Sequence, residues 1–338
     1  MKLEQAAFGV HSHDGIALGV IECPGEYTWS RELNQVSRLS LKAPLQELST
    51  EIVPLVHWIS CWHGQSLQWV GLIEDSLRDR TGMSIAAKDH ARLLQWTRTP
   101  TTRQWNQLDV APIAADLWRD MLAMRGIQAE PIVLPQLAEQ ERYNVTATAD
   151  QRLVSQDIAE LSKLGLRWTV VKGRPVLGLQ PTTVAAELED CHLTSGAHIR
   201  RSGARTANDV RVQGKNAAWT ERVELGGLRM QSIVSLDDLF GVNNIQRAAA
   251  DYVRRSARIR DELVVPPAAT LTPDAPVELD MLVPGVHLSV SALGLRSVLR
   301  VDQVQVSGSP QSIDVALTLS TPEWVSELER AGGQVISG

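Results

Sequence analysis

Apolar residues change their spacing several times along this chain of 338 residues. Up to about residue 108 they alternate with polar residues between frequent turn signals, which is typical of short β-strands. The dipeptide Asp14-Gly15 lies between two apolar runs and predicts a β-hairpin. The runs 55–62, 67–73 and 83–87 follow one another across glycine-containing turns and predict a three-stranded meander. A meander of this length usually belongs to a β-barrel or a β-sandwich.

The spacing becomes helical after residue 100. Apolar residues recur at helical intervals over 110–122, with Asp109 placed as N-cap and Gly126 just past the end. A second helix is expected over about 150–164, where apolar residues share one face and Gly165 stops the helix. We therefore expect a helical part inserted between β-rich parts.

Strand patterns return after the second helix. A hairpin is expected directly behind it, with strands at 166–171 and 175–179, which completes a small α/β subdomain. Two further strands, 210–213 and 219–223, flank a stretch of Gly, Asn and Ala that suits a turn.

A third helix is expected from Asn243 or Asn244 through Arg260. Its apolar residues share a face: Ile245, Ala248, Ala249, Tyr252 and Val253. The opposite side carries Arg247, Arg254, Arg255 and Arg258. We interpret these arginines as a solvated basic face, which suits the negative end of the helix dipole.

Proline marks the next boundary, at 266–276. Beyond it apolar residues alternate strictly over 313–319, and more briefly over 286–290 and 304–306, which predicts strands. Pro322 is well placed to open a short last helix. The sequence as a whole predicts a β-dominated α+β protein of two or three domains.

Composition excludes some classes of protein. No apolar stretch approaches the ~20 residues that a helix needs to cross a bilayer. The first residues lack a basic region followed by an apolar one, so we expect synthesis and folding in a cytoplasm. Lys and Arg number 33 against 39 Asp and Glu, a net charge of −6, which disfavours nucleic-acid binding. Three widely spaced cysteines argue against a disulfide framework, and we expect Cys23, Cys61 and Cys191 to be small buried hydrophobes.

Several clusters of reactive residue types do not form a recognisable catalytic site. The run His11-Ser12-His13-Asp14 has hydrolase residue types, but neighbours in a strand point to opposite faces, so a polar loop is expected. Lys88-Asp89-His90 places an acid beside an imidazole without a nucleophile elbow. The sequon Asn144-Val145-Thr146 has no meaning without secretion. The sequence therefore predicts no catalytic residue, no bound cofactor and no enzyme.

The best metal candidate is the trio His57, Cys61 and His63. Their even spacing puts three ligand types on one face of a strand, but no fourth ligand follows at zinc-finger spacing. Whether the trio binds a metal stays open, and no metal site is assigned.

Tryptophan is concentrated in the first third of the chain, with seven of ten between Trp29 and Trp118. Large apolar bodies that fill a core or a subunit contact are the favoured interpretation. A stacking platform for sugars is the alternative.

One stretch resembles a known family. It runs from Tyr27 to Leu41 with the sequence Tyr-Thr-Trp-Ser-Arg-Glu-Leu-Asn-Gln-Val-Ser-Arg-Leu-Ser-Leu. The hairpin ending at 69–73 and the run Ile-Ala-Ala-Lys-Asp at 85–89 follow it. This order and spacing resemble minor tail proteins of the tail hub, or baseplate hub, family from long non-contractile-tailed phages, especially those that infect Actinobacteria.

The resemblance implies a domain plan. A first β-barrel tube domain would comprise 1–108 and 189–235, interrupted by the inserted α/β subdomain at 109–188. A linking helix would occupy 236–261. A second tube domain with a short C-terminal helix would occupy 262–338.

The resemblance also implies a function without catalysis. Three copies would form a ring of six barrels, matching a trimer to a sixfold tail tube. The ring would lie at the tail tip of the virion, after assembly in the cytoplasm of the bacterial host. Its partners would be the distal tail protein, the tape-measure protein and other minor tail or fibre proteins. DNA would pass through the ring without specific binding, and no lytic domain is expected.

Two other interpretations stay open at this point. The first is a cell-wall-directed module of the tail tip, which would bind glycans through exposed Trp or hydrolyse peptidoglycan through the His and Asp clusters above. Coplanar exposed Trp or a strongly perturbed carboxylate in a cleft would favour it. The second is another β-rich virion component, such as a distal tail ring protein, against which the inserted helical subdomain speaks.

Overall fold

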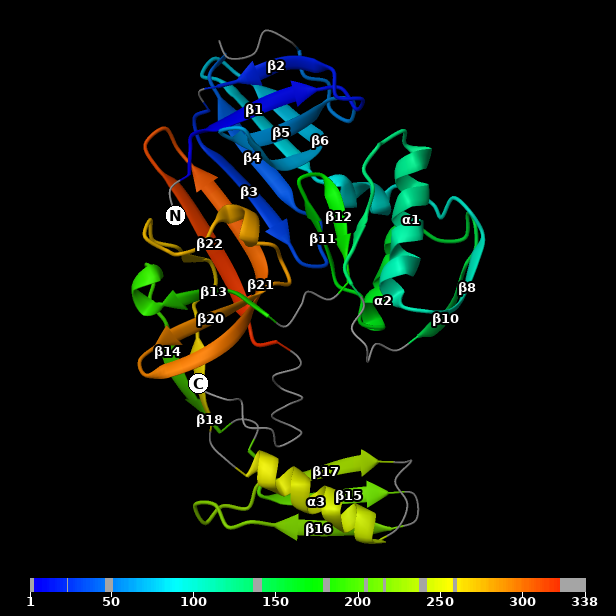
Figure 1. Cartoon of the computed structure of the whole chain (residues 1–338), viewed down its shortest axis with the longest axis vertical. Coiled ribbons are helices and arrows are strands. Elements are labelled where there is room, and N and C mark those ends of the chain that lie inside the picture. The colour runs from blue at the N-terminus through cyan, green and yellow to red at the C-terminus, as the bar shows by residue number, and fades with distance from the viewer. Residues whose placement is uncertain are drawn as a thin grey trace. The chain divides into compact units, whose positions relative to one another are not determined.

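The computed structural model describes residues 3–22, 24–45, 51–135, 142–178, 183–203, 206–214, 217–236, 242–257 and 260–322. The chain divides into two compact units. Unit 1 comprises Met1–Gly196, Pro266–Ser289 and Leu299–Ser320. Unit 2 comprises Ala197–Val265, Val290–Val298 and Thr321–Gly338. Strands predominate over helices, so the fold is a β-dominated α+β fold, as the sequence predicted (Figure 1).

A twelve-stranded sheet, here called the large sheet, dominates the fold. Its strands are, in order, β13 (Val184–Glu189), β20 (His287–Ala292), β21 (Leu295–Gly308), β3 (Tyr27–Glu32), β4 (Arg38–Ala43), β7 (Met83–Lys88), β6 (Ser66–Arg78), β5 (Trp58–His63), β1 (Ala6–His11) and β2 (Ala17–Ile21), with β22 (Ile313–Ser320) paired to β21 and β19 (Ala269–Thr270) paired to β22. The order has two ends, so the described strands form no closed barrel, and the two-barrel arrangement stays a prediction.

Local turn signals account for the antiparallel neighbours in the first third. The hairpin β1–β2 and the meander β5–β6–β7 form as predicted. Gly15 has a φ of 85° and Gly64 a φ of 57°, so each turn uses a conformation that favours glycine. The strand β5 begins at Trp58 rather than at residue 55 because residues 54–56 form a turn.

Successive side chains of a strand point to opposite faces, which gives the large sheet an apolar and a polar face. The apolar face is buried and includes Phe8, Val10, Trp29, Leu39, Leu41, Ile59, Cys61, Ile73, Ile85, Val304 and Val306. The last two belong to β21, which pairs antiparallel with β3 so that Tyr27 lies opposite Gly308. The sheet therefore joins segments from both ends of the chain, which show as blue and orange strands side by side in Figure 1.

The helical part of unit 1 has its own core. It comprises β8 (Arg103–Leu108), α1 (Val110–Met124), β9 (Ile132–Val133), β10 (Tyr143–Ala147), α2 (Val154–Lys163), β11 (Trp168–Val171) and β12 (Arg174–Leu177). The Asp109 carboxylate caps α1 by accepting from the Val110 N–H, and Gly126 follows its end with a φ of 69°. Helix α2 starts at Val154, later than the sequence predicted, and ends before Gly165. β8, which precedes the expected start of the subdomain at residue 109, pairs with β10.

Unit 2 contains a small sheet and the third helix. β15 (Asp209–Gly214) pairs antiparallel with β16 (Ala218–Arg222) and parallel with β17 (Gln231–Leu236). α3 (Val242–Ser256) packs on this sheet through Ile245, Ala249 and Val253, with Val210 and Val212 in the same cluster. β14 (His198–Ser202) pairs with β18 (Arg260–Val264).

Two expectations about this region are corrected. The third helix begins at Val242, so Asn243 and Asn244 lie in its first turn rather than before it. It ends at Ser256 rather than Arg260, because Arg260 opens β18 and pairs with Ser202. The strands β14 to β17 pair with one another or with β18, and their assignment to the first tube domain stays a prediction.

The predicted helix after Pro322 lies outside the described residues, and the domain plan itself stays a prediction. No helix within the described part of the chain is long and apolar enough to cross a membrane.

Candidate functional site on the polar face of the large sheet

β3 carries a fully buried arginine on the apolar face of the large sheet. The Nη1 of Arg31 donates to the carbonyl oxygens of Leu279 and Leu282 at 3.2 and 3.3 Å. Its Nη2 donates to the carbonyl oxygen and Oε1 of Gln68 at 3.0 and 2.7 Å. Burial lowers the pKa of this guanidinium to about 10, and Asp280 opposes that shift. Arg31 therefore ties β3, β6 and the segment 279–282 together as a charged group inside the protein.

Asp280 extends this contact to the helical subdomain. Its carboxylate accepts from Lys172 Nζ at 3.0 Å and from Gln68 Nε2 at 3.1 Å. Burial alone would raise the pKa of Asp280, but the bonds from Lys172 and Gln68 outweigh it and lower the pKa. Lys172 lies in the turn between β11 and β12, so one carboxylate connects three segments that are distant in the sequence.

The loop between β3 and β4 fixes the subdomain from the other side. Asn34 adopts a φ of 57°, its N–H donates to the Trp168 carbonyl at 2.7 Å, and its Oδ1 accepts from the Trp168 N–H at 2.8 Å. Thr169 Oγ1 donates to the carbonyl of Glu32 at 2.9 Å. A left-handed conformation is tolerated by Asn better than by most residues. The loop is thus held in one shape beside β11.

Two buried titratable groups lie under this loop. The Asp89 carboxylate accepts from the N–H groups of Ser37 and Ala91 at 3.2 and 3.0 Å, which makes it the N-cap of the 3₁₀-helix His90–Gln95. Burial raises the pKa of Asp89 to about 7, although these hydrogen bonds act against the rise. Burial lowers the pKa of His90 to about 4, and its Nδ1 bonds the Gly173 carbonyl at 2.5 Å.

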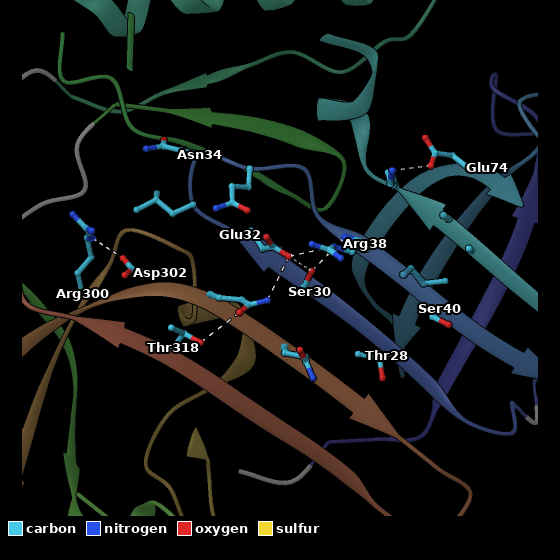
Figure 2. A pocket seen from close by; sticks show the side chains of 18 residues that line it. Thr28, Ser30, Glu32, Asn34, Arg38, Ser40, Glu74, Arg300, Asp302 and Thr318 are labelled. Atoms are coloured by element: carbon cyan, nitrogen blue, oxygen red, sulfur yellow. Dashed lines mark hydrogen bonds and ion pairs between the residues drawn. The ribbon is translucent and has the colours of Figure 1, made fainter. Parts of the chain in front are cut away.

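A polar groove of about 910 Å³ opens on the other face of β3. Its side chains come from β3, β4, β6, β7, β21 and β22 and from the loop between β3 and β4, and Figure 2 shows the labelled ones around one space. Its charged members are Glu32, Arg38, Glu74, Lys88, Arg300 and Asp302. We call this space the polar groove.

Most charges in the polar groove are already paired. Glu74 accepts from Lys88 Nζ at 3.0 Å and from Arg92 Nε at 2.5 Å. Arg300 Nε donates to Asp302 at 2.8 Å. Glu32, which is only 8% exposed, accepts from Ser30 Oγ at 2.9 Å and from Gln303 Nε2 at 3.4 Å. The groove therefore offers hydrogen-bond donors and acceptors together with charges of both signs.

Solved structures of tail proteins are similar to this chain in their overall fold. The 43 kDa tail protein of prophage MuSo2 from Shewanella oneidensis matches with a TM-score of 0.59 at 13% identity, covering 94% of this chain and 98% of that chain. This chain shares the fold of prophage tail proteins. No protein-family model matches the sequence, and no curated protein matches it.

Two further tail proteins have this fold. A tail protein from Neisseria meningitidis MC58 matches with a TM-score of 0.57 at 15% identity, over 93% of this chain and 96% of that chain. The prophage tail protein gp18 from Listeria monocytogenes EGD-e matches with a TM-score of 0.50 at 12% identity, over 99% and 100%. The tail-protein fold thus extends over nearly the whole of each chain.

The sequence clusters with reactive residue types take structural roles in this fold. In the run 11–14, Ser12 Oγ donates to the Asp14 carboxylate and accepts from the Ile16 N–H at 3.1 Å, inside the β1–β2 turn. Lys88 pairs with Glu74, while Asp89 and His90 are buried as described. In the sequon, the Asn144 side chain accepts from the Gln107 N–H at 2.9 Å.

The three candidate metal ligands make separate contacts. His57 Nδ1 accepts from the Val53 N–H at 3.1 Å, and His63 Nδ1 bonds the Glu4 carbonyl at 2.8 Å. Cys61 is buried on the apolar face, where burial raises the pKa of its thiol. No group of three His, Cys, Asp or Glu that could hold a metal occurs among the described residues.

Tryptophan is mainly used in cores, as the favoured interpretation predicted. The buried ones are Trp29, Trp58, Trp69, Trp105, Trp118 and Trp168. Trp62, Trp96 and Trp219 are between 37% and 39% exposed, and the guanidinium of Arg92 lies 4.4 Å from the Trp96 ring. Cys191 is exposed, which corrects the expectation that it is a buried hydrophobe, whereas Cys23 lies outside the described residues.

Sequence reasoning missed the polar groove. The signal for one wall was present, because Thr28, Ser30 and Glu32 alternate with Tyr27, Trp29 and Arg31 along β3. The same alternation places Arg31 on the apolar face. The opposite wall belongs to β21 and β22, and no local pattern indicates that they pair next to β3.

Proposed function

We propose that this protein is a structural component of a phage tail, namely the hub at the tail tip, with no catalytic role. The observation that carries the proposal is the fold shared with the MuSo2 tail protein over 94% of this chain and 98% of that one. In this proposal three copies form a pseudo-sixfold ring of tube domains. The ring closes the tail tube, anchors tip proteins for host attachment and opens for DNA delivery.

The finer parts of the proposal come from the resemblance of the sequence. They are a long non-contractile tail, an actinobacterial host, assembly in the host cytoplasm, and contacts with distal tail, tape-measure and fibre proteins. The cell-wall-directed alternative gains no support from Asp89, whose carboxylate is buried under a loop and bonded to backbone N–H groups.

Immunogold labelling of purified phage particles tests the proposal, with antibodies raised against the full chain. We expect gold at the tail end that is distal to the capsid. Gold on capsids, or particles that lack the chain altogether, would contradict the proposal. Light scattering and negative-stain imaging of the protein released from particles test the ring separately. We expect hollow trimers, and any other stoichiometry contradicts the trimer.

A further inference from the structure

Two cations lie directly opposite each other in the large sheet. Arg38 of β4 and Lys88 of β7 are cross-strand partners in the antiparallel ladder, and both line the polar groove. Like charges in this relation destabilise a sheet. A local cost of this kind is expected mainly where it serves a function.

Both cations have a carboxylate partner, but the pair of Lys88 is closer than that of Arg38. Lys88 pairs with Glu74 at 3.0 Å. The Arg38 side chain is 74% exposed, and its ion pair is with Glu32 at 4.0 Å, a carboxylate that already accepts from Ser30 and Gln303. Arg38 therefore presents an accessible guanidinium whose carboxylate neighbour is shared.

A second groove meets the polar groove at this pair. It encloses about 620 Å³ and shares Asn34, Gln35, Arg38 and Lys88 with the polar groove. One wall is a single face of α2, made by residues at helical spacing: Ser155, Ile158, Ala159 and Ser162. Val36, Ala91, Leu94 and Trp168 supply the apolar part of the other wall. We call this space the α2 groove.

The charged residues that line the α2 groove are both cations. Arg38 and Lys88 are its charged lining residues, and no carboxylate is among the described lining. Apolar surface beside a pair of cations suits an extended peptide segment that carries an acidic residue next to apolar ones. Arg is especially suited to bind carboxylates, since its planar fork of donors matches both oxygens.

We infer that Arg38 and Lys88 bind a carboxylate of an acidic, extended segment from a neighbouring protein, whose apolar side chains lie in the α2 groove. That the neighbour is another tail protein rests on the proposed function, whereas the chemistry of the groove does not. Nucleic acid fits less well, because the adjoining polar groove is lined by Glu32, Glu74 and Asp302, which would repel successive phosphates.

Fluorescence anisotropy with the full chain tests the inference. The probe is a short fluorescein-labelled peptide in which glutamate alternates with leucine and serine. We expect binding that weakens as salt is raised. Arg38→Glu should weaken it about tenfold or more, the size expected when a hydrogen bond to a charged group is lost. Lys88→Gln should weaken it less, because Glu74 already shares that charge.

The matched control is Arg80→Glu, which makes the same charge change in the exposed turn at the opposite end of β7 and should bind as the wild type does. Circular dichroism verifies that each variant is folded, and Arg38→Gln replaces Arg38→Glu if the reversal unfolds the protein. The inference is overturned if the wild type fails to bind the peptide, if the Arg38 variants bind it equally well, or if a labelled oligothymidylate binds the same residues more tightly.

Failure of this inference can be told apart from failure of the proposed function. A chain that immunogold places at the tail tip, but that does not bind the peptide, overturns only the inference. A chain that is absent from particles, but that binds the peptide through Arg38, retains the groove chemistry and overturns the assignment of its partner to the tail.

Discussion

On one face of β3 Arg31 is fully buried and donates to four oxygens of neutral groups, whereas on the other face Glu32 and Arg38 border an open groove. The buried cation holds distant segments together and has fixed partners. The groove charges are distributed over several partners and leave Arg38 accessible. The difference teaches that arginines on adjacent strands take different roles: Arg31 of β3 holds segments together on the apolar face, whereas Arg38 of β4 stays accessible on the polar face.

The strongest test of this contrast is Arg31→Leu. The change leaves the carbonyl oxygens of Leu279, Leu282 and Gln68 without their donor in the interior. Each unpaired buried group costs about 1–3 kcal/mol, so we expect the free energy of unfolding to fall by about 3–5 kcal/mol. Urea denaturation followed by tryptophan fluorescence measures it. A loss below about 1 kcal/mol would show that Arg31 does not hold these segments.

A second test fills space on the apolar face. Gly308 of β21 lies opposite Tyr27, and a Cβ built on it would overlap the Tyr27 ring. We expect Gly308→Ala to lower the free energy of unfolding by about 1–3 kcal/mol through overpacking. Ser307→Ala, one position along and on the polar face, is the control, and its loss of a contact with Thr28 should cost about 1 kcal/mol or less. Equal effects of the two substitutions would contradict the assignment of faces.

The pH dependence of the free energy of unfolding probes the two buried titratable groups, Asp89 and His90. The pKa of Asp89 is raised from 3.8 to about 7. Its contribution to the free energy of unfolding is therefore complete below pH 3.8 and is lost as the pH rises through 7. The pKa of His90 is lowered from 6.5 to about 4. Its contribution to the free energy of unfolding is therefore complete above pH 6.5 and is lost as the pH falls through 4. Between pH 4 and 6.5 the two slopes oppose each other.

Two variants separate these slopes. Asp89→Asn should leave a stability that rises with pH across this window, and His90→Gln one that falls, each by up to about 1.4 kcal/mol per pH unit. Urea denaturation at several pH values in the window measures both, with the wild type as reference. If the free energy of unfolding of the wild type changes with pH as steeply as that of either variant, the two groups do not oppose each other.

The smallest expected effect concerns Arg38→Gln. Removing an exposed cation that faces Lys88 relieves repulsion and loses a weak pair with Glu32, so we expect a change within about 0.5 kcal/mol. Thermal denaturation of the unliganded protein checks this. A loss of more than about 1 kcal/mol would mean that Arg38 holds the fold as Arg31 does.

Elements with local signals could be predicted from the sequence. Helix α1 follows its cap Asp109 as expected, and the turns at Gly15 and Gly64 join the predicted hairpin strands. The end of α3 could not be predicted, because Arg260 continues the helical pattern but opens β18, where it pairs with Ser202 of β14. The pairing of β3 with β21 has no local signal either, since it depends on residues at the far end of the chain.

The candidate site was hidden for the same reason. Each wall of the polar groove reads as an ordinary alternating strand, and only tertiary pairing brings Glu32 beside Gln303. The clusters that drew attention, such as His57, Cys61 and His63, are instead absorbed into turns and the apolar face. The residue type alone does not tell a histidine that packs in the fold from one that binds a metal.

The pairing of β3 with β21 also sets a schedule for biosynthesis. Thr28 and its partner Ser307 are 279 positions apart. At roughly 5–20 residues per second, a ribosome needs about 15 s to a minute to supply the second strand after the first. During that interval one edge of β3 has no native neighbour, so the nascent chain is exposed to pairing with other chains. Slower translation of the last third should therefore increase aggregation of this protein more than slower translation of the first.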